Sequence, residues 1–115
     1  MSVFLLSSFT AKAPVKKDPT VAPYVSALAM YQAGRNPDWY IDIWVRWAQG
    51  TTLSRDYYAD VSVTYTDNCR VNPPWTVVKR CIVKAGQWMS FTDFNACGGG
   101  QITIVTYSLV AWGPL

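Results

Sequence analysis

The alternation that decides the fold lies in one run of ten residues, WYIDIWVRWA, at positions 39–48. From position 41 to 47, every odd-numbered residue is large and apolar, whereas the even-numbered residues include an aspartate and an arginine. A period of two with one apolar side is typical of a half-buried β-strand. We therefore expect a strand that fills the core with Ile41, Ile43, Val45 and Trp47.

The same chemistry recurs in the rest of the chain. β-Branched and aromatic residues dominate four further candidate strands, at Tyr57–Thr66, Trp75–Lys84, Gln87–Phe94 and Gln101–Trp112. Turn residues separate these runs, and the stretch Tyr24–Tyr31 fits either a strand or a helix. Short strands at this spacing predict an all-β protein, built as an antiparallel two-sheet sandwich.

The first residues predict a short helix over Ser2–Lys12 that ends before Pro14. An isolated helix of this length is barely stable in water, so its apolar stripe needs a surface to pack on. That surface is either the chain's own sandwich or a second subunit. The expected organisation is a helix at residues 1–13, used for dimerisation, and a sandwich domain at residues 14–115.

Length and composition restrict the function classes. A chain of 115 residues, half of them hydrophobic, is long enough for one domain with one core. The net charge of +3 is too weak and too scattered to predict nucleic-acid binding. The longest uncharged stretch, residues 20–34, contains a proline and several polar residues, so we expect no membrane insertion.

Residue types that catalysis and metal binding need are missing or unsuitably spaced. The chain has no histidine, the commonest general base and metal ligand. All 7 acidic residues are aspartates, and either Asp38 with Asp42 or Asp56 with Asp60 is close enough for a catalytic pair, although such aspartates more often cap turns. We expect no enzyme, no cofactor and no metal, with hydrolysis by paired aspartates as a distant alternative. Three cysteines fit no zinc spacing and are expected to be structural, with their pairing left open: Cys69, Cys81 and Cys97.

Aromatic residues give the stronger signal. The chain holds 6 Trp, 7 Tyr and 4 Phe, and the run at 39–48 places Tyr40 and Trp44 on its polar side with Asp42 and Arg46. Flat rings stack on sugars while charged groups hydrogen-bond the hydroxyls, and the same residue types anchor protein partners. This side therefore indicates a glycan-binding surface, unless a dimer partner or a loop covers it. The alternative is a non-enzymatic interaction or effector module whose aromatic face is a protein interface.

Several segments, in order and spacing, resemble the fungal immunomodulatory proteins, a family of small mushroom mitogens. GRNPDWYID at 34–42 follows the Lys16-Lys17 pair and is similar to the family's Gly-Arg-Gly-x-Pro-x-x-(Tyr/Phe)-Ile-Asp segment. MSFTDFN at 89–95 precedes a glycine-rich loop and a β-branched strand, as in the family. Ala111-Trp112 resembles the Ala-x-Trp segment at the family's C-terminal end. The chain departs from the family in having cysteines and methionines, and in having Ala33 where the family carries a tryptophan.

The resemblance implies an immunoglobulin-like or fibronectin-III-like sandwich that forms a homodimer by exchanging its N-terminal helix and first strand. The dimerisation residues would be Val3, Phe4, Leu6 and Phe9. It also implies a secreted or fruiting-body soluble lectin that binds cell-surface glycans or glycoprotein receptors and stimulates immune cells. Tyr31 or Trp39 would replace the missing tryptophan. The expected carbohydrate-binding residues are Tyr31, Arg35, Asp38, Trp39, Asp42, Trp44, Asn95, Gly98 and Gly99.

Overall fold

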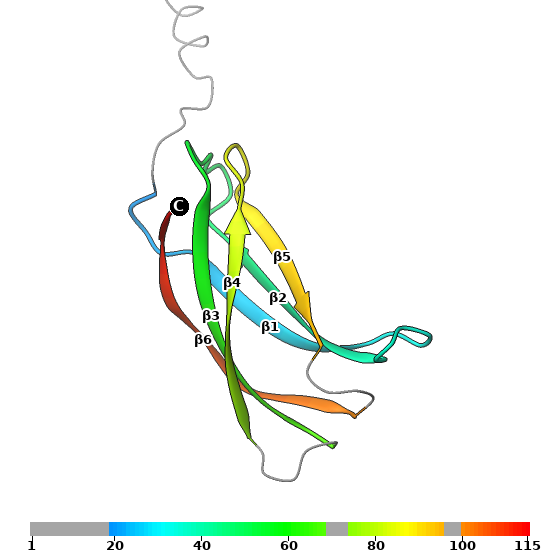
Figure 1. Cartoon of the computed structure of the whole chain (residues 1–115). Coiled ribbons are helices and arrows are strands. Elements are labelled where there is room, and N and C mark those ends of the chain that lie inside the picture. The colour runs from blue at the N-terminus through cyan, green and yellow to red at the C-terminus, as the bar shows by residue number, and fades with distance from the viewer. Residues whose placement is uncertain (1–18, 69–73, 96–99) are drawn as a thin grey trace, which may run out of the picture.

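The strands form two antiparallel sheets packed face to face (Figure 1). The computed structural model describes residues 19–68, 74–95 and 100–115. One sheet has the order β1-β2-β5 and the other the order β4-β3-β6, so the chain changes sheet after β2, β4 and β5. The strands are β1 (Tyr24–Tyr31), β2 (Trp39–Arg46), β3 (Tyr57–Asp67), β4 (Trp75–Val83), β5 (Met89–Phe94) and β6 (Ile102–Pro114).

The expected all-β sandwich is confirmed within these residues. Each strand predicted from alternation is present, and its ends lie within two residues of the predicted ones. The ambiguous stretch at 24–31 is a strand because β2 pairs with all eight of its residues, from Tyr24 opposite Arg46 to Tyr31 opposite Trp39. Among the described residues, no helix has the length and apolar character needed to cross a membrane. The helix predicted at 2–12 and the dimerisation residues Val3, Phe4, Leu6 and Phe9 lie outside the described residues.

The core lies between the sheets and takes the predicted side of β2. Ile41, Ile43 and Val45 are fully buried, and the odd-numbered residues of β3 face them. The indole ring of Trp47 lies 5.6 Å from the Tyr57 ring, and its Nε1 donates a hydrogen bond of 3.0 Å to the Val21 carbonyl. Because β2 is the central strand of its sheet and its odd-numbered side chains are fixed in the core, its even-numbered side chains are held on the outer face.

Candidate functional site

The outer face of the β1-β2-β5 sheet presents its side chains in rows that cross the three strands. Residues directly opposite one another on antiparallel strands point to the same face. Two residues along a strand are about 6.8 Å apart, so neighbouring rows are separated by roughly the width of a sugar ring. The two middle rows, taken from β1 to β5, are Ser26–Trp44–Phe91 and Leu28–Asp42–Asp93. An aromatic row therefore lies directly beside a carboxylate row.

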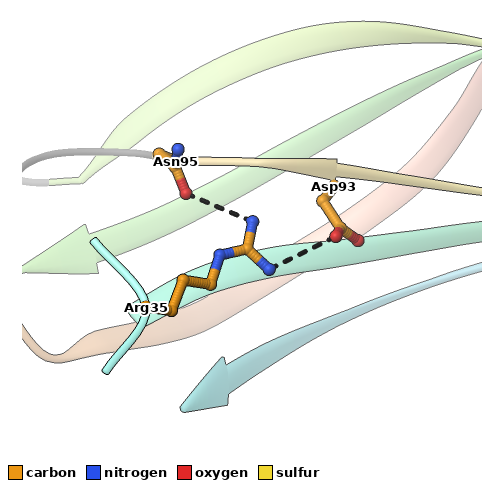
Figure 2. A network of polar contacts seen from close by, with 3 residues as sticks. All are labelled: Arg35, Asp93 and Asn95. Atoms are coloured by element: carbon orange, nitrogen blue, oxygen red, sulfur yellow. Dashed lines mark hydrogen bonds and ion pairs between the residues drawn. The ribbon is translucent and has the colours of Figure 1, made fainter. Parts of the chain in front are cut away.

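Arg35 ties the carboxylate row to the end of β5, as Figure 2 shows. Its Nη1 lies 3.3 Å from Oδ2 of Asp93, and its Nη2 donates to Oδ1 of Asn95 at 3.4 Å. The guanidinium carbon also lies 3.4 Å from the centre of the Tyr40 ring, in cation–π geometry. One arginine thus joins the β1–β2 loop to β2, through Tyr40, and to the end of β5.

The local sequence of the β1–β2 loop explains how Arg35 reaches the sheet. The amide of Gln32 donates to the carbonyl of Asp38 at 2.9 Å, and the amide of Arg35 donates to the carbonyl of Gln32 at 3.1 Å. Gly34 has φ of 88°, in the left-handed region that glycine adopts without strain. The tight turn made by these residues turns the Arg35 side chain toward β5.

Asp42 and Asp93 form a carboxyl pair across β2 and β5. The pKa of Asp42 is raised from its ordinary value, first by burial and then by a hydrogen bond with Asp93 and that residue's negative charge. The charge of Arg35 acts in the opposite direction on the same pKa. The pair together with Arg35 therefore carries excess negative charge and offers several hydrogen-bond acceptors at the surface.

Apolar and aromatic side chains surround the pair on the same face. Phe91 is 59% exposed and Leu28 is 51% exposed. At the opposite end of the face, the Arg46 guanidinium lies 4.9 Å from the Tyr24 ring centre and 5.3 Å from that of Trp44. This arginine holds the aromatic rings in place while leaving Phe91 open to solvent.

A hollow of about 490 Å³ lies at the Tyr24 end of β1. Its wall includes Trp47 and the loop residues Gln49–Thr52. None of the described residues that line it is charged. The charged groups able to bind sugar hydroxyls are therefore gathered around Arg35 and not in this hollow.

The predicted site residues separate into two groups. Arg35, Asp42, Trp44 and Asn95 come together on the outer face. The ring centres of Tyr31 and Trp39 lie 5.5 Å apart. Trp39 packs against the core and therefore lies on the other side of β2 from Asp42. Asp38 contributes its carbonyl to the loop, and Gly98 and Gly99 lie outside the described residues.

Two residues of the outer face were not among those predicted for the site, Phe91 and Asp93. The alternation in MSFTDFN places both on one side of a strand, together with Asn95. That pattern could have identified the side chains as a group. It could not have shown that they lie opposite Trp44 and Asp42, because the pairing of distant strands sets that register.

The other aspartates considered for catalysis have basic partners on the second sheet. Asp60 accepts two hydrogen bonds from Arg80, at 2.8 and 3.0 Å, and these lower its pKa. Asp56 accepts from the Ala85 amide at 2.8 Å, which with nearby Lys84 lowers its pKa. Within the described ranges, no group of three or more acidic or cysteine side chains is placed to hold a metal ion.

Comparisons with protein families, with curated proteins and with solved structures found no matching family model and no significant match. The resemblance to the fungal immunomodulatory proteins therefore stays a prediction, and the geometry of the outer face is the observation that bears on function.

Proposed function

We propose that the protein is a non-enzymatic lectin that binds glycans on the outer face of the β1-β2-β5 sheet. The observation that supports this most directly is the aromatic row of Trp44 and Phe91 beside the carboxyl pair of Asp42 and Asp93. A sugar has an apolar ring face and a rim of hydroxyls, and these two rows supply a partner for each.

The binding mode follows from the chemistry of the two rows. The exposed ring of Phe91, with Trp44 beside it, stacks on the apolar face of a sugar ring. Asp42 and Asp93 then accept hydrogen bonds from its hydroxyls, and such bonds to charged groups are roughly twice as strong as neutral ones. Arg35 keeps Asp93 in position through its ion pair. Two carboxyls against one guanidinium favour neutral glycans over sialylated or sulfated ones.

The side-by-side placement of the two carboxyls supports binding over hydrolysis. Glycoside hydrolases place their two carboxyl groups about 5–9.5 Å apart, with the scissile bond between them. Asp42 and Asp93 lie directly opposite each other on neighbouring strands and project from the same outer face, so both carboxyl groups approach a bound sugar from one side. This geometry is the reason for proposing a lectin and not an enzyme.

We also propose the finer properties that the family resemblance implies. The sandwich would be immunoglobulin-like or fibronectin-III-like, since strands one, two and five share a sheet while strands three and six share the other. The protein would be secreted or a soluble fruiting-body protein. It would act as a homodimer, with Val3, Phe4, Leu6 and Phe9 as contacts, that bridges glycoprotein receptors and stimulates immune cells.

A glycan array tests this proposal with the parent and three variants. We expect the parent to bind neutral glycans, and both Trp44→Ala and Asp42→Asn to lose about tenfold or more in affinity, because each removes one of the two kinds of contact. Asp60→Asn is the matched control: it changes a carboxylate that also lies on an outer face, but on the other sheet. An array without signal, or equal losses for Asp42→Asn and Asp60→Asn, would contradict the proposal.

A protein interface on the same face is the second candidate. The cluster of Arg46, Tyr24 and Trp44 favours it, since these residue types dominate the binding energy of protein interfaces. If the array is silent while Trp44→Ala abolishes binding to a purified cell-surface protein without glycans, this candidate replaces the lectin.

A further inference from the structure

The four edge strands of the sandwich differ in how well they are protected against pairing. In the part of the chain that the structure describes, β1 and β5 border one sheet, and β4 and β6 border the other. An edge strand exposes unpaired backbone groups that can bind another strand. Native proteins usually block such edges with charged side chains, prolines, bulges or short strands.

Three of the four edges carry one of these devices. β4 contains Lys79 and Arg80, and β5 is only six residues long and contains Asp93. β6 is interrupted by two register shifts against β3 and ends at Pro114. Each of these strands would therefore pair poorly with a copy of itself.

β1 has none of these devices. Its eight residues, YVSALAMY, include no charged residue and no proline. Its register with β2 runs without a shift from Tyr24 to Tyr31, so the strand is regular along its length. Leu28, near its middle, is 51% exposed on the outer face. A long, regular and uncharged edge of this kind is suited to association.

We propose that β1 is the seam of a homodimer, in which the β1 strands of two copies pair antiparallel. A strand that meets its own copy places equal charges near each other, which destabilises the pair; β1 is free of that penalty, whereas β4 is not. Opposite residues must lie on the same face, so the two-fold axis passes through Ala27 or Leu28. In either register, small or apolar side chains meet at the axis.

This contact differs from the exchange of N-terminal elements that the family resemblance implies. β1 stays hydrogen-bonded to its own β2, and the new ladder forms on the opposite edge of the strand. The result is one continuous six-stranded sheet in the order β5-β2-β1-β1-β2-β5. No residue of the segment 1–13 is required for it. The seam is therefore an alternative to the dimer contacts at Val3, Phe4, Leu6 and Phe9, and a parent of twice the chain mass uses one of the two.

The seam gives the proposed lectin a second property, and this part of the inference rests on the proposed function. The two-fold axis of an antiparallel pair is perpendicular to the sheet, so the outer faces of both copies point in the same direction. The two β2 strands lie three strand spacings apart, about 15 Å. Both carboxyl pairs then face one cell surface, and binding at two sites can raise avidity by about 10²–10⁴.

Sedimentation velocity of the full chain over a range of concentrations tests the seam without any glycan. We expect the parent to have twice the 12.9 kDa mass of the chain. Leu28→Lys places like charges near the axis, so its mass should fall twofold at the same concentration. Val78→Lys is the matched control: it replaces an aliphatic residue that is 56% exposed on β4 and should leave the dimer intact.

Hydrogen exchange supplies a measurement that needs no variant. We expect amides of β1 in the parent to exchange faster on dilution, as the dimer dissociates, while those of β6 do not change. A parent that is monomeric at all concentrations would overturn the proposal, and slow exchange of β1 in that monomer would show that another part of the same chain covers the edge. A dimer that survives Leu28→Lys, or open-ended assembly of the parent, would overturn it as well.

The dimer seam and the lectin function can be refuted by different outcomes. Asp42→Asn should lose glycan binding and remain a dimer. A dimer that Leu28→Lys dissociates, combined with a silent glycan array, refutes only the lectin. Glycan binding by a strictly monomeric parent refutes only the seam.

Discussion

Asp42 of β2 and Asp93 of β5 lie directly opposite each other on the outer face of one sheet, and Asp93 raises the pKa of Asp42. Two neighbouring acids repel when both are ionised, so the negative charge of Asp93 adds to burial in raising the pKa of Asp42. Arg35 moderates the repulsion by pairing with Asp93. The pKa of Asp42 is therefore a direct reporter on the site.

Removal of the opposing acid should lower that pKa. In Asp93→Asn, the negative charge is gone and the amide can donate a hydrogen bond to ionised Asp42, so both changes favour the charged form. NMR titration of the Asp42 side chain would measure the shift, with Asp60→Asn as a control that leaves it unchanged. An unchanged pKa in Asp93→Asn would show that the two carboxyls do not interact in solution.

Removal of the guanidinium should move the same pKa in the other direction. The positive charge of Arg35 lowers the pKa of Asp42, so Arg35→Ala should raise it further. Arg35→Lys keeps the charge but loses the planar fork that reaches both Asp93 and Asn95, and should shift the pKa less. If Arg35→Ala lowered the pKa, the arrangement of Arg35 around Asp93 would be wrong.

Asp42 and Asp60 should give stability opposite pH dependences. The raised pKa of Asp42 means that its contribution to stability is fully present below the unfolded value near 3.8 and is lost as pH rises through the folded pKa. The hydrogen bonds from Arg80 lower the pKa of Asp60, so its contribution is present above about 3.8 and is lost as pH falls through the folded pKa.

Urea unfolding at several pH values would separate the two carboxyls. At pH 7, Asp42→Asn should be more stable than the parent, because it removes an unfavourable charge. Asp60→Asn should be less stable by about 0.2–1 kcal/mol, the range for surface ion pairs. Both differences should shrink toward pH 2. If both variants changed the free energy of unfolding in the same direction at pH 7, the opposite pKa directions of Asp42 and Asp60 would be contradicted.

The residues of β2 show how much of this molecule the sequence can predict. Ile41, Ile43 and Val45 were predicted for the core because alternation is a local property, and all three are buried. Trp39 has the same parity, so alternation alone places it on the core side. It was predicted for the site through the family resemblance, which does not specify the face of the strand.

The pairing of Asp42 with Asp93 is a part of the candidate site that could not be predicted from the sequence. Pairs were sought among aspartates close together in the chain, such as Asp56 and Asp60, whereas Asp42 meets Asp93 from a distant strand. Strand register depends on the packing of the whole sheet and on its turns. The alternation within each strand therefore does not reveal which residues of two distant strands lie opposite each other. The structure thus assembles the candidate site from two segments that the sequence shows only separately.

Trp47 should be the most sensitive position of the core. Its ring centre lies 5.6 Å from that of Tyr57 and 6.0 Å from that of Trp112, and its Nε1 donates a hydrogen bond to the Val21 carbonyl. Trp47→Ala should cost about 3–5 kcal/mol in the free energy of unfolding, whereas Ile43→Val, at a fully buried position, should cost about 0.5–1.5 kcal/mol. Urea unfolding measures both, and equal costs would mean that Trp47 does not join the two sheets.

Cys81 should be a free thiol that reacts only when the sandwich opens. It is fully buried on the core side of β4, and burial raises its thiol pKa, helped by the charge of Asp60 and opposed by a hydrogen bond with Thr92. A Cys69→Ser/Cys97→Ser variant leaves this thiol alone for labelling. Its reaction with a disulfide reagent at pH 8 should be at least about 100-fold slower in buffer than in urea, the factor that an opening free energy near 3 kcal/mol produces. Rapid labelling in buffer, or a disulfide to Cys81 in the parent, would place this strand away from the core.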